Sequence, residues 1–129
     1  MNINPFSFNE HVLALRELRS EILSSNIANA DTPNYKARDI DFSRALKDAS
    51  GEQIAMRKTN KLHLSHITTN RLGAAVQYRI PVQPTLDGNT VETDVEQAQF
   101  AENNVRHQAA LRFLGGQISG LRYAIRGGE

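Results

Sequence analysis

Two long stretches of the chain have helical hydrophobic periodicity, and the stretch between them does not. Near the N-terminus, apolar side chains recur every three or four residues, which is the spacing of one helix face. They are Phe8, Val12, Leu15, Leu18, Ile22 and Ile27. Ser7 followed by Glu10 matches a capping box, so we expect this helix to begin at Ser7. Pro33 disfavours helical angles at Thr32, so the helix should end near 29–31.

A second, longer helix is predicted from Thr93 to Ile125, where no proline interrupts the chain. Thr93 and Glu96 form a second possible capping box. Residues at alternating spacings of four and three form a heptad seam over nearly four repeats. This seam consists of Phe100, Asn104, His107, Leu111, Leu114, Ile118, Leu121 and Ile125. Acidic residues near the start and basic residues near the end suit the helix dipole, and Gly127 and Gly128 should end the helix.

Three glycines, Gly115, Gly116 and Gly120, lie inside the second helix, where each costs about 1 kcal/mol relative to alanine. Two explanations are open at this point. Either neighbouring backbones approach closely there, or the helix needs local flexibility before it assembles.

The middle, residues 32–90, is expected to be irregular with some β structure. A short helix over 42–49 should close at Gly51. Residues 76–82 alternate apolar and polar side chains, which predicts an exposed strand that two nearby prolines confine to a sheet edge. Residues 87–88, Asp-Gly, mark a turn.

The predicted fold class is therefore mainly α, with N- and C-terminal helices forming a coiled-coil core and an extended, partly β middle segment. We expect one unit with an N-terminal helix in 1–31, the middle in 32–90 and a C-terminal helix in 91–129. The middle is too polar to cover both apolar stripes, so the helices should pair and bury the remainder against other chains. A compact monomeric hairpin is the alternative.

Composition and charge exclude several classes of protein. The 129 residues fit one domain, and 15 basic against 14 acidic residues give a net charge of +1, too near neutral for a typical nucleic-acid-binding surface. The absence of cysteine excludes disulfides, thiolate metal sites and a cysteine nucleophile. No apolar run reaches the roughly 18–20 residues needed to span a bilayer. Residues 1–10 lack the features of a secretory signal, so export would need another route.

Candidate chemistry is sparse. His63 and His66 are three residues apart, a spacing compatible with zinc on a helix, but no third ligand follows and neighbouring apolar residues favour packing. No catalytic motif is present. We therefore expect no enzyme activity, no metal and no cofactor.

Asp39 and Asp41 could suggest paired carboxylates for acid–base chemistry. Lys36, Arg38 and Arg44 nearby favour solvated ion pairs instead. The middle also has a basic bias that could contact nucleic acid, although it lacks interleaved aromatic residues, so an acidic neighbouring subunit is the preferred partner. The basic residues are Arg44, Lys47, Arg57, Lys58, Lys61 and Arg71.

The segment 23–42 closely resembles the N-terminal signature of flagellar rod, hook and related axial proteins. The core of the match is Asn26-Ile-Ala-Asn29, followed by Thr32-Pro33 and Tyr35. In physical terms, the amides of Asn26 and Asn29 can bond neighbouring backbones, and Tyr35 is an amphipathic anchor. Family members usually carry glycine where this chain has Asn34, and asparagine tolerates the positive φ that the turn needs.

Further stretches resemble the short proximal rod proteins of the FlgB type within the flagellar basal-body rod family. They are 37–42, 58–64, 87–91, 99–104 and 114–118. Other axial proteins tend to end in Gln-Arg-Ala-Tyr-like pairs, which this chain lacks. Glu92 is a departure, because aspartate is common there.

The resemblance implies a structural subunit of the proximal rod, which crosses the periplasm and transmits torque. It implies export by the flagellar type III apparatus without a cleaved signal peptide. Expected partners are copies of the chain, other rod subunits and the membrane-ring adaptor, with no nucleic acid or small-molecule substrate. The expected subunit-interface residues are Phe8, Val12, Leu15, Leu18, Ile22, Asn26, Ile27, Asn29, Thr32, Pro33, Tyr35, Phe100, Asn104, His107, Leu111, Leu114, Ile118, Leu121 and Ile125. The alternative is a small helical regulatory or nucleic-acid-binding protein.

Overall fold

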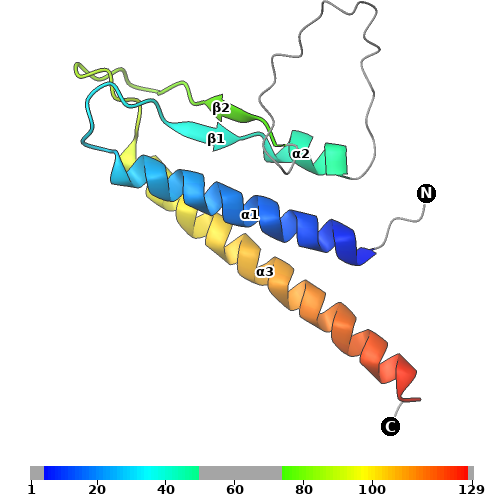
Figure 1. Ribbon diagram of the computed structural model, residues 1–129. Helices are drawn as coiled ribbons and strands as arrows, with labels where there is room; N and C mark the ends of the chain where they lie inside the picture. Colours follow the sequence, from blue (N-terminus) through cyan, green and yellow to red (C-terminus); the bar gives the residue numbers. More distant parts are fainter. Residues whose placement is uncertain (1–4, 50–73, 128–129) are drawn as a thin grey trace, which may run out of the picture.

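Two long antiparallel helices dominate the molecule (Figure 1). The computed structural model describes residues 5–49 and 74–127. Its elements, in chain order, are α1 (Pro5–Ala28), β1 (Arg38–Ile40), α2 (Phe42–Ala49), β2 (Val76–Tyr78) and α3 (Thr93–Ile125). The predicted fold class is confirmed, because the terminal helices pack against each other and the middle contributes a small antiparallel sheet.

Both predicted capping boxes are wrong. The chain is already helical at Pro5, ahead of Ser7, and proline suits the first turn of a helix because its missing N–H would be unpaired there. At the start of α3 the N-cap position is Glu92, which makes no side-chain capping bond. Glu96 is fully buried, and its carboxylate bonds other elements rather than the helix end.

The helix ends agree better with the sequence. Helix α1 ends at Ala28, one residue before the predicted stop. Helix α3 ends at Ile125, and Gly127 follows in the left-handed region with φ of 75°. Asp94 lies in its first turn and Arg122 in its last turn, as the helix dipole favours.

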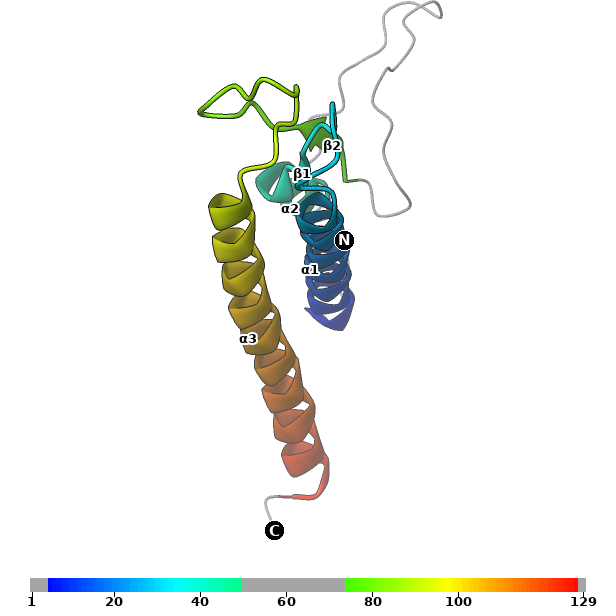
Figure 2. The same ribbon diagram turned by 90° about the vertical axis from the view of Figure 1, so that its left-hand side faces the viewer.

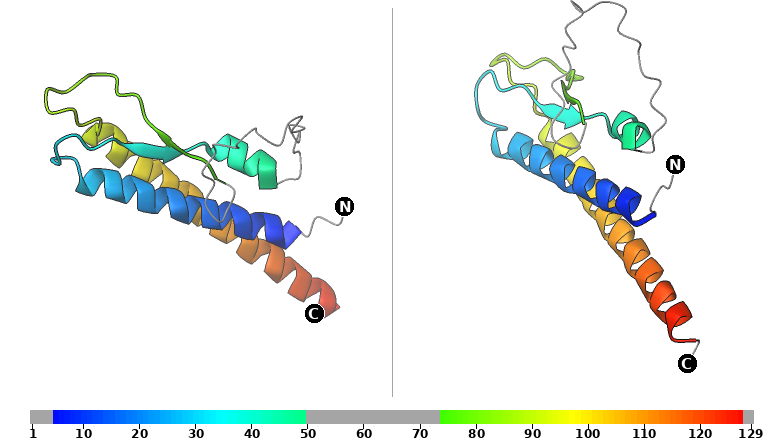
Figure 3. Two further views of the ribbon diagram at one scale, coloured as in Figure 1. Left: turned by 45° about the horizontal axis from the view of Figure 1, so that its top comes forward. Right: turned by 45° about the vertical axis from the view of Figure 1, so that its right-hand side comes forward.

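Helix α1 lies between α3 and a thin layer formed by the two strands and α2 (Figure 3). Leu15 and Ile22 of α1 are buried in a cluster with Ile40, Ala45 and Ala74 from that layer. The middle of the chain therefore covers the central apolar stripe of α1. Other chains were expected to complete the burial of this stripe. That expectation is wrong for the central residues of the stripe, Leu15 and Ile22, which are buried within this chain.

The sheet joins β1 and β2 in antiparallel register, with Asp39 opposite Gln77. The N–H of Arg79 continues the pairing to the carbonyl of Ala37 at 2.9 Å. Strand β2 is shorter than the predicted 76–82 because Pro81 has no N–H to donate to a ladder. The short helix predicted over 42–49 is confirmed; Gly51 lies outside the described residues.

Two tight turns meet beside the end of α1. Asn34 has φ of 60° and Gly88 has φ of 73°, which confirms the positive φ predicted at Asn34 and the turn predicted at 87–88. The N–H of Asn34 donates to the carbonyl of Asp87 at 3.0 Å. A Cβ on Gly88 would lie 2.6 Å from Oδ1 of Asn34, so the close approach favours glycine there.

Within the part of the chain that the structure describes, no helix combines the length and the apolar character needed to cross a membrane.

Candidate assembly site

Asn26 links three elements through one fully buried amide. Its Nδ2 donates to the carbonyl of Arg38 at 2.7 Å and to Oε2 of Glu96 at 3.1 Å. Its Oδ1 accepts from the N–H of Arg38 at 3.1 Å and from the hydroxyl of Tyr35 at 3.3 Å. The predicted bonding of Asn26 to a neighbouring backbone is confirmed, within the same chain. The amide fixes β1 against α1 and α3.

The C-terminal end of α1 is closed by Asn89, which the sequence reading missed. Its Nδ2 reaches the carbonyls of Asn29, Ala30 and Thr32 at 3.0, 2.7 and 3.0 Å. Its Oδ1 accepts from the N–H of Val91 at 2.7 Å. The side chain therefore satisfies carbonyls that a helix end leaves without partners. The signal available was its place after the Asp-Gly turn, inside the stretch 87–91.

Asn29, also in the signature, directly follows α1 and bonds the end of that helix. Its Nδ2 donates to the carbonyl of Ser25 at 2.8 Å, and its Oδ1 accepts from the hydroxyl of Thr32 at 3.2 Å. Its predicted backbone bond is thus present, and it strengthens the last turn of α1 rather than joining another element.

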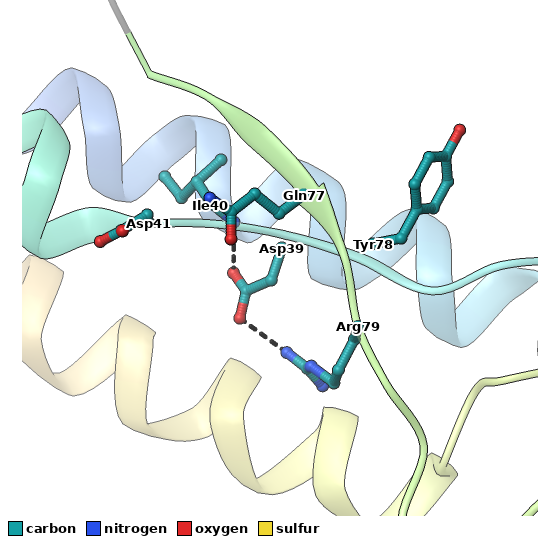
Figure 4. Close-up of a pocket in the computed structure, with 6 residues that line it drawn as sticks. All are labelled: Asp39, Ile40, Asp41, Gln77, Tyr78 and Arg79. Carbon is teal, nitrogen blue, oxygen red and sulfur yellow. Dashed lines mark hydrogen bonds and ion pairs between the residues drawn. The ribbon is translucent and has the colours of Figure 1, made fainter. Parts of the chain in front are cut away.

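A cluster of charged side chains ties the sheet to both long helices. Asp39 accepts from Nε and Nη2 of Arg19, both at 2.9 Å, and from Nη2 of Arg79 at 2.6 Å. Nη1 of Arg79 binds Oε1 of Glu96 at 2.5 Å. Oε1 of Gln99 accepts from Arg19 at 2.8 Å and from Arg79 at 2.9 Å. Figure 4 shows Asp39 and Arg79 reaching towards each other, with Tyr78 pointing away.

The partners predicted for Asp39 are wrong. It pairs with Arg19 and Arg79, not with Lys36, Arg38 or Arg44. Side chains alternate along a strand, so Asp39 faces the helices while the exposed Arg38 faces the other way.

Burial alone raises the pKa of Asp39, but hydrogen bonds from Arg19, from the N–H of Ile40 and from Arg79 outweigh it. The pKa of Asp39 therefore lies below its ordinary value, and the bond to Asp39 raises the pKa of Arg19. A carboxylate held in its charged form cannot serve as a general acid near neutral pH. Asp41 accepts from the N–H of Arg44 at 3.0 Å and so caps the start of α2. Each of the two carboxylates therefore has structural partners within this chain.

Polar contacts determine which side of α3 faces α1. Nδ2 of Asn103 donates to the carbonyl of Arg16 at 2.8 Å, and Nδ2 of Asn9 donates to Oε1 of Gln117 at 2.7 Å. The line of α3 residues with buried or half-buried side chains on this side is Glu96, Phe100, Asn103, His107, Ala110, Leu114 and Gln117. The predicted seam shares Phe100, His107 and Leu114 with this line. Between and after these residues the line runs one position before the seam, through Asn103, Ala110 and Gln117. The seam residues Leu111 and Ile118 are exposed, and Asn104 is half-buried.

The larger apolar side chains of α3 are consequently left open. Leu111 is 48% exposed, Ile118 44%, Leu121 48% and Ile125 83%. Two causes combine: Leu111 and Ile118 flank the line that faces α1, and α3 continues past the start of α1 (Figure 2). A Cβ built on Gly115, Gly116 or Gly120 meets no atom of the described residues within 4 Å. Close approach by the backbone of another described segment of this chain is therefore not the reason for these glycines.

Comparison of the sequence with known proteins identifies the family of this chain. The family model described as flagella basal body rod protein matches residues 13–36, which contain Asn26 and the end of α1. The flagellar basal body rod protein FlgB of Cereibacter sphaeroides is 53% identical over 115 residues, covering 89% of this chain and 88% of the relative. FlgB of Escherichia coli K12 is 44% identical over 129 residues, covering 95% and 93%, and FlgB of Yersinia enterocolitica is 44% identical over 127 residues, covering 94% and 93%.

This chain belongs to the FlgB family of flagellar basal body rod proteins. It is a structural subunit of that rod and interacts with other components of the basal body. The alternative of a regulatory or nucleic-acid-binding protein is not supported.

The interface residues predicted for this FlgB-family chain fall into three groups by burial. Buried within the chain are Leu15, Ile22 and Asn26. Half-buried are Phe8, Val12, Leu18, Ile27, Asn29, Tyr35, Phe100, Asn104, His107 and Leu114. Exposed are Thr32, Pro33, Leu111, Ile118, Leu121 and Ile125. Only the last group is exposed to a partner in this structure of a FlgB-family chain.

The remaining candidates are not tested in full. His63, His66 and the basic residues at 57–71 lie outside the described residues. Across residues 5–49 and 74–127, no group of three or more His, Asp or Glu side chains is placed to hold a metal ion. The shallow pocket between the strands is lined in part by Asp39 and Arg79, which are already paired with each other.

Proposed function

We propose that the chain is a proximal rod subunit that assembles through the open apolar side chains of α3 and thereby transmits torque. The observation that carries this proposal is the exposure of Leu111, Ile118, Leu121 and Ile125 on a well-formed helix. Fully burying a leucine or isoleucine side chain contributes about 1.5–3 kcal/mol. Four such side chains, each at least 44% exposed, offer a partner a substantial part of that free energy.

The other predicted interface residues contribute in a different way under this proposal. Leu15, Ile22 and Asn26 are buried and hold α1 rigid against the sheet and α3. We infer that they set the direction in which α3 projects rather than contacting neighbours. Thr32 and Pro33 are exposed at the turn after α1, where a neighbouring subunit can reach them.

The partners are copies of this chain, other rod subunits and the membrane-ring adaptor. The location is the periplasmic part of the basal body, reached by the flagellar type III export apparatus without a cleaved signal peptide. The feature that supports this part of the proposal is the family membership.

The test is a pair of matched acidic substitutions on α3. Ile118→Asp places a charge among the open apolar side chains, whereas Ser119→Asp places it on an exposed position outside that group. We expect both variants to keep the helical circular dichroism of the wild type. Only Ile118→Asp should fail to enter basal bodies and abolish swimming. Leu114→Asp is less informative because Leu114 is half-buried in the line of α3 residues facing α1. Normal swimming of the Ile118→Asp strain contradicts the proposal.

A further inference from the structure

A second exposed apolar surface lies far from the first. Among the described residues outside α3, all exposed large apolar side chains belong to one short segment, 76–86. We call this set the apolar row: Val76, Tyr78, Ile80, Val82 and Leu86. Tyr78 is 73% exposed, Ile80 89% and Val82 86%. Strand alternation places Val76, Tyr78 and Ile80 on one face, while Arg79 points to the opposite side and into the ionic cluster (Figure 4).

The matching surface is the end of α3, which we call the α3 tail: Leu111, Phe113, Ile118, Leu121, Tyr123 and Ile125. The apolar row precedes the first residue of α3, and the tail ends at its last turn. A helix of 33 residues is about 50 Å long. The two surfaces thus lie at opposite ends of the molecule in both Figure 1 and Figure 2 and cannot meet within one chain.

Charge favours contact between these two surfaces. No acidic residue occurs between Glu102 and Glu129, and the tail carries Arg112, Arg122 and Arg126. Around the apolar row the acidic residues are Asp31, Asp87, Glu92 and Asp94, against the exposed bases Lys36 and Arg38. Among the described residues, more acidic than exposed basic side chains therefore surround the row, whereas the tail carries only basic ones.

The exposed face of α1 is the competing acceptor for a basic tail. Three of its exposed side chains are acidic: Glu10, Glu17 and Glu21. The other exposed side chains that the structure describes on this helix are small: Ser7, Ser24 and Ala28. That face can attract arginines, yet it offers no large apolar side chain against which Ile118 or Leu121 could pack. The apolar row combines both properties.

We propose that the α3 tail of one copy docks on the apolar row of a second copy, so that copies add head to tail. This inference rests on the proposed function and specifies one of its contacts. A contact between two different surfaces leaves one of each free at the ends of every oligomer, so it extends into an open, helical assembly unless the rotation closes a ring. An isologous contact of tail with tail would stop at a dimer.

Two variants of the full chain test this contact by mixing. The row variant is Ile80→Asp/Val82→Asp, and the tail variant is Ile118→Asp/Leu121→Asp; all four positions are exposed, so folding should be retained. In sedimentation, the wild type should form oligomers that grow with concentration, and each variant alone should be monomeric, with association at least tenfold weaker. The mixture should form a 1:1 dimer and nothing larger, because the intact tail of the row variant meets the intact row of the tail variant.

Cross-linking provides a second measurement, since the chain has no cysteine of its own. The double variant Val82→Cys/Leu121→Cys should give a ladder of disulfide-linked oligomers under oxidation. Each single cysteine variant should give none. A dimer from Leu121→Cys alone would show that tails pair with tails and would overturn the head-to-tail contact.

Other outcomes separate the two proposals. If the row variant assembles and swims normally while the tail variant does neither, the head-to-tail contact is wrong and the proposed function stands. If the tail variant swims normally, the proposed function itself fails. A wild type that stays monomeric overturns the contact. If the row variant is then also less stable than the wild type, the row is covered by other residues of its own chain. If the row variant is stable but its strain cannot swim, the row binds a different protein.

Discussion

The side-chain amide of Asn26 bonds both backbone groups of Arg38, its Nδ2 to the carbonyl and its Oδ1 to the N–H. The amide thus occupies the place that a neighbouring strand would take beside β1. Its remaining bonds reach Glu96 and Tyr35, so the donors and acceptors of this fully buried group are used. One residue of the signature connects the first helix, the sheet and the last helix.

Replacing this amide should be costly. Asn26→Ala leaves both backbone groups of Arg38 without this partner, and each buried unsatisfied group costs about 1–3 kcal/mol. We expect the free energy of unfolding to fall by about 3 kcal/mol in urea denaturation. The matched control is Asn9→Ala, because Asn9 lies on the same helix as Asn26 and makes a single half-buried bond to Gln117 of α3. It should lower the free energy of unfolding by about 1 kcal/mol. Equal losses for the two variants would contradict the role given to Asn26.

Asn89 makes a similar prediction for the end of α1. Asn89→Ala removes the donor shared by three carbonyls and should lower the free energy of unfolding by about 2 kcal/mol. Hydrogen exchange should show the effect most strongly in the amides of the last turn of α1. Asn104→Ala, at a half-buried asparagine of α3, is the control and should leave those amides as protected as in the wild type.

The positive φ of Asn34 separates two substitutions of similar size. Glycine adopts this region without steric cost, whereas alanine pays about 1 kcal/mol. We therefore expect Asn34→Gly to stay within about 0.5 kcal/mol of the wild type in thermal unfolding, and Asn34→Ala to be less stable by about 1 kcal/mol. If alanine is tolerated as well as glycine, the backbone at Asn34 does not impose the turn.

The ionic cluster predicts a pH dependence of stability. Because the folded pKa of Asp39 lies below its unfolded value of about 3.9, its stabilising contribution is complete above that value. The contribution is lost as the pH falls through the folded pKa. The stability difference between the wild type and Asp39→Asn should thus be constant from pH 7 to about pH 5 and should narrow below about pH 4.

Urea denaturation of both proteins across this pH range measures the effect. Repeating it in an Arg19→Met background should give a smaller difference at neutral pH, since Arg19 donates two of the bonds to Asp39. A difference that stays the same down to pH 2.5 would show that the charge of Asp39 contributes nothing.

Local chemistry was enough to predict the long elements. The uninterrupted periodicity before Gly127 predicted a helix to Ile125, and the Pro33 turn predicted the end of α1 within one residue. The positive φ at Asn34 was predictable because asparagine itself tolerates this backbone conformation. These features depend on neighbours in the sequence and need no knowledge of the rest of the chain.

Features set by distant contacts were not predictable in the same way. The capping box at Thr93 and Glu96 failed because Arg79 and Asn26 hold the Glu96 carboxylate inside the molecule. Asp39 pairs with residues 20 and 40 positions away, beyond the reach of any local pattern. The nearby bases Lys36 and Arg44 were therefore misleading.

The seam of α3 shows the same limit. Hydrophobic periodicity placed Leu111 and Ile118 in one seam of α3, but it could not show which seam residues pair with α1. Helix α1 presents Asn9 and Arg16, which bond Gln117 and Asn103. The register of two helices depends on both surfaces at once. The sequence thus identified the apolar side chains of α3, but not which of them lie on the side of the helix that pairs with α1.

The small core has a calorimetric consequence. Among the described residues, the buried apolar side chains include only Leu15, Ile22, Leu23 and Ile40 besides alanines, since amides and charges occupy much of the contact between the helices. Exposure of apolar surface raises the heat capacity on unfolding, and exposure of polar surface lowers it. Globular proteins average about 12–15 cal/mol/K per residue for this heat-capacity change, and the isolated subunit should show a smaller value when it unfolds. Its stability curve should be correspondingly flat, with little change between cold and warm growth conditions.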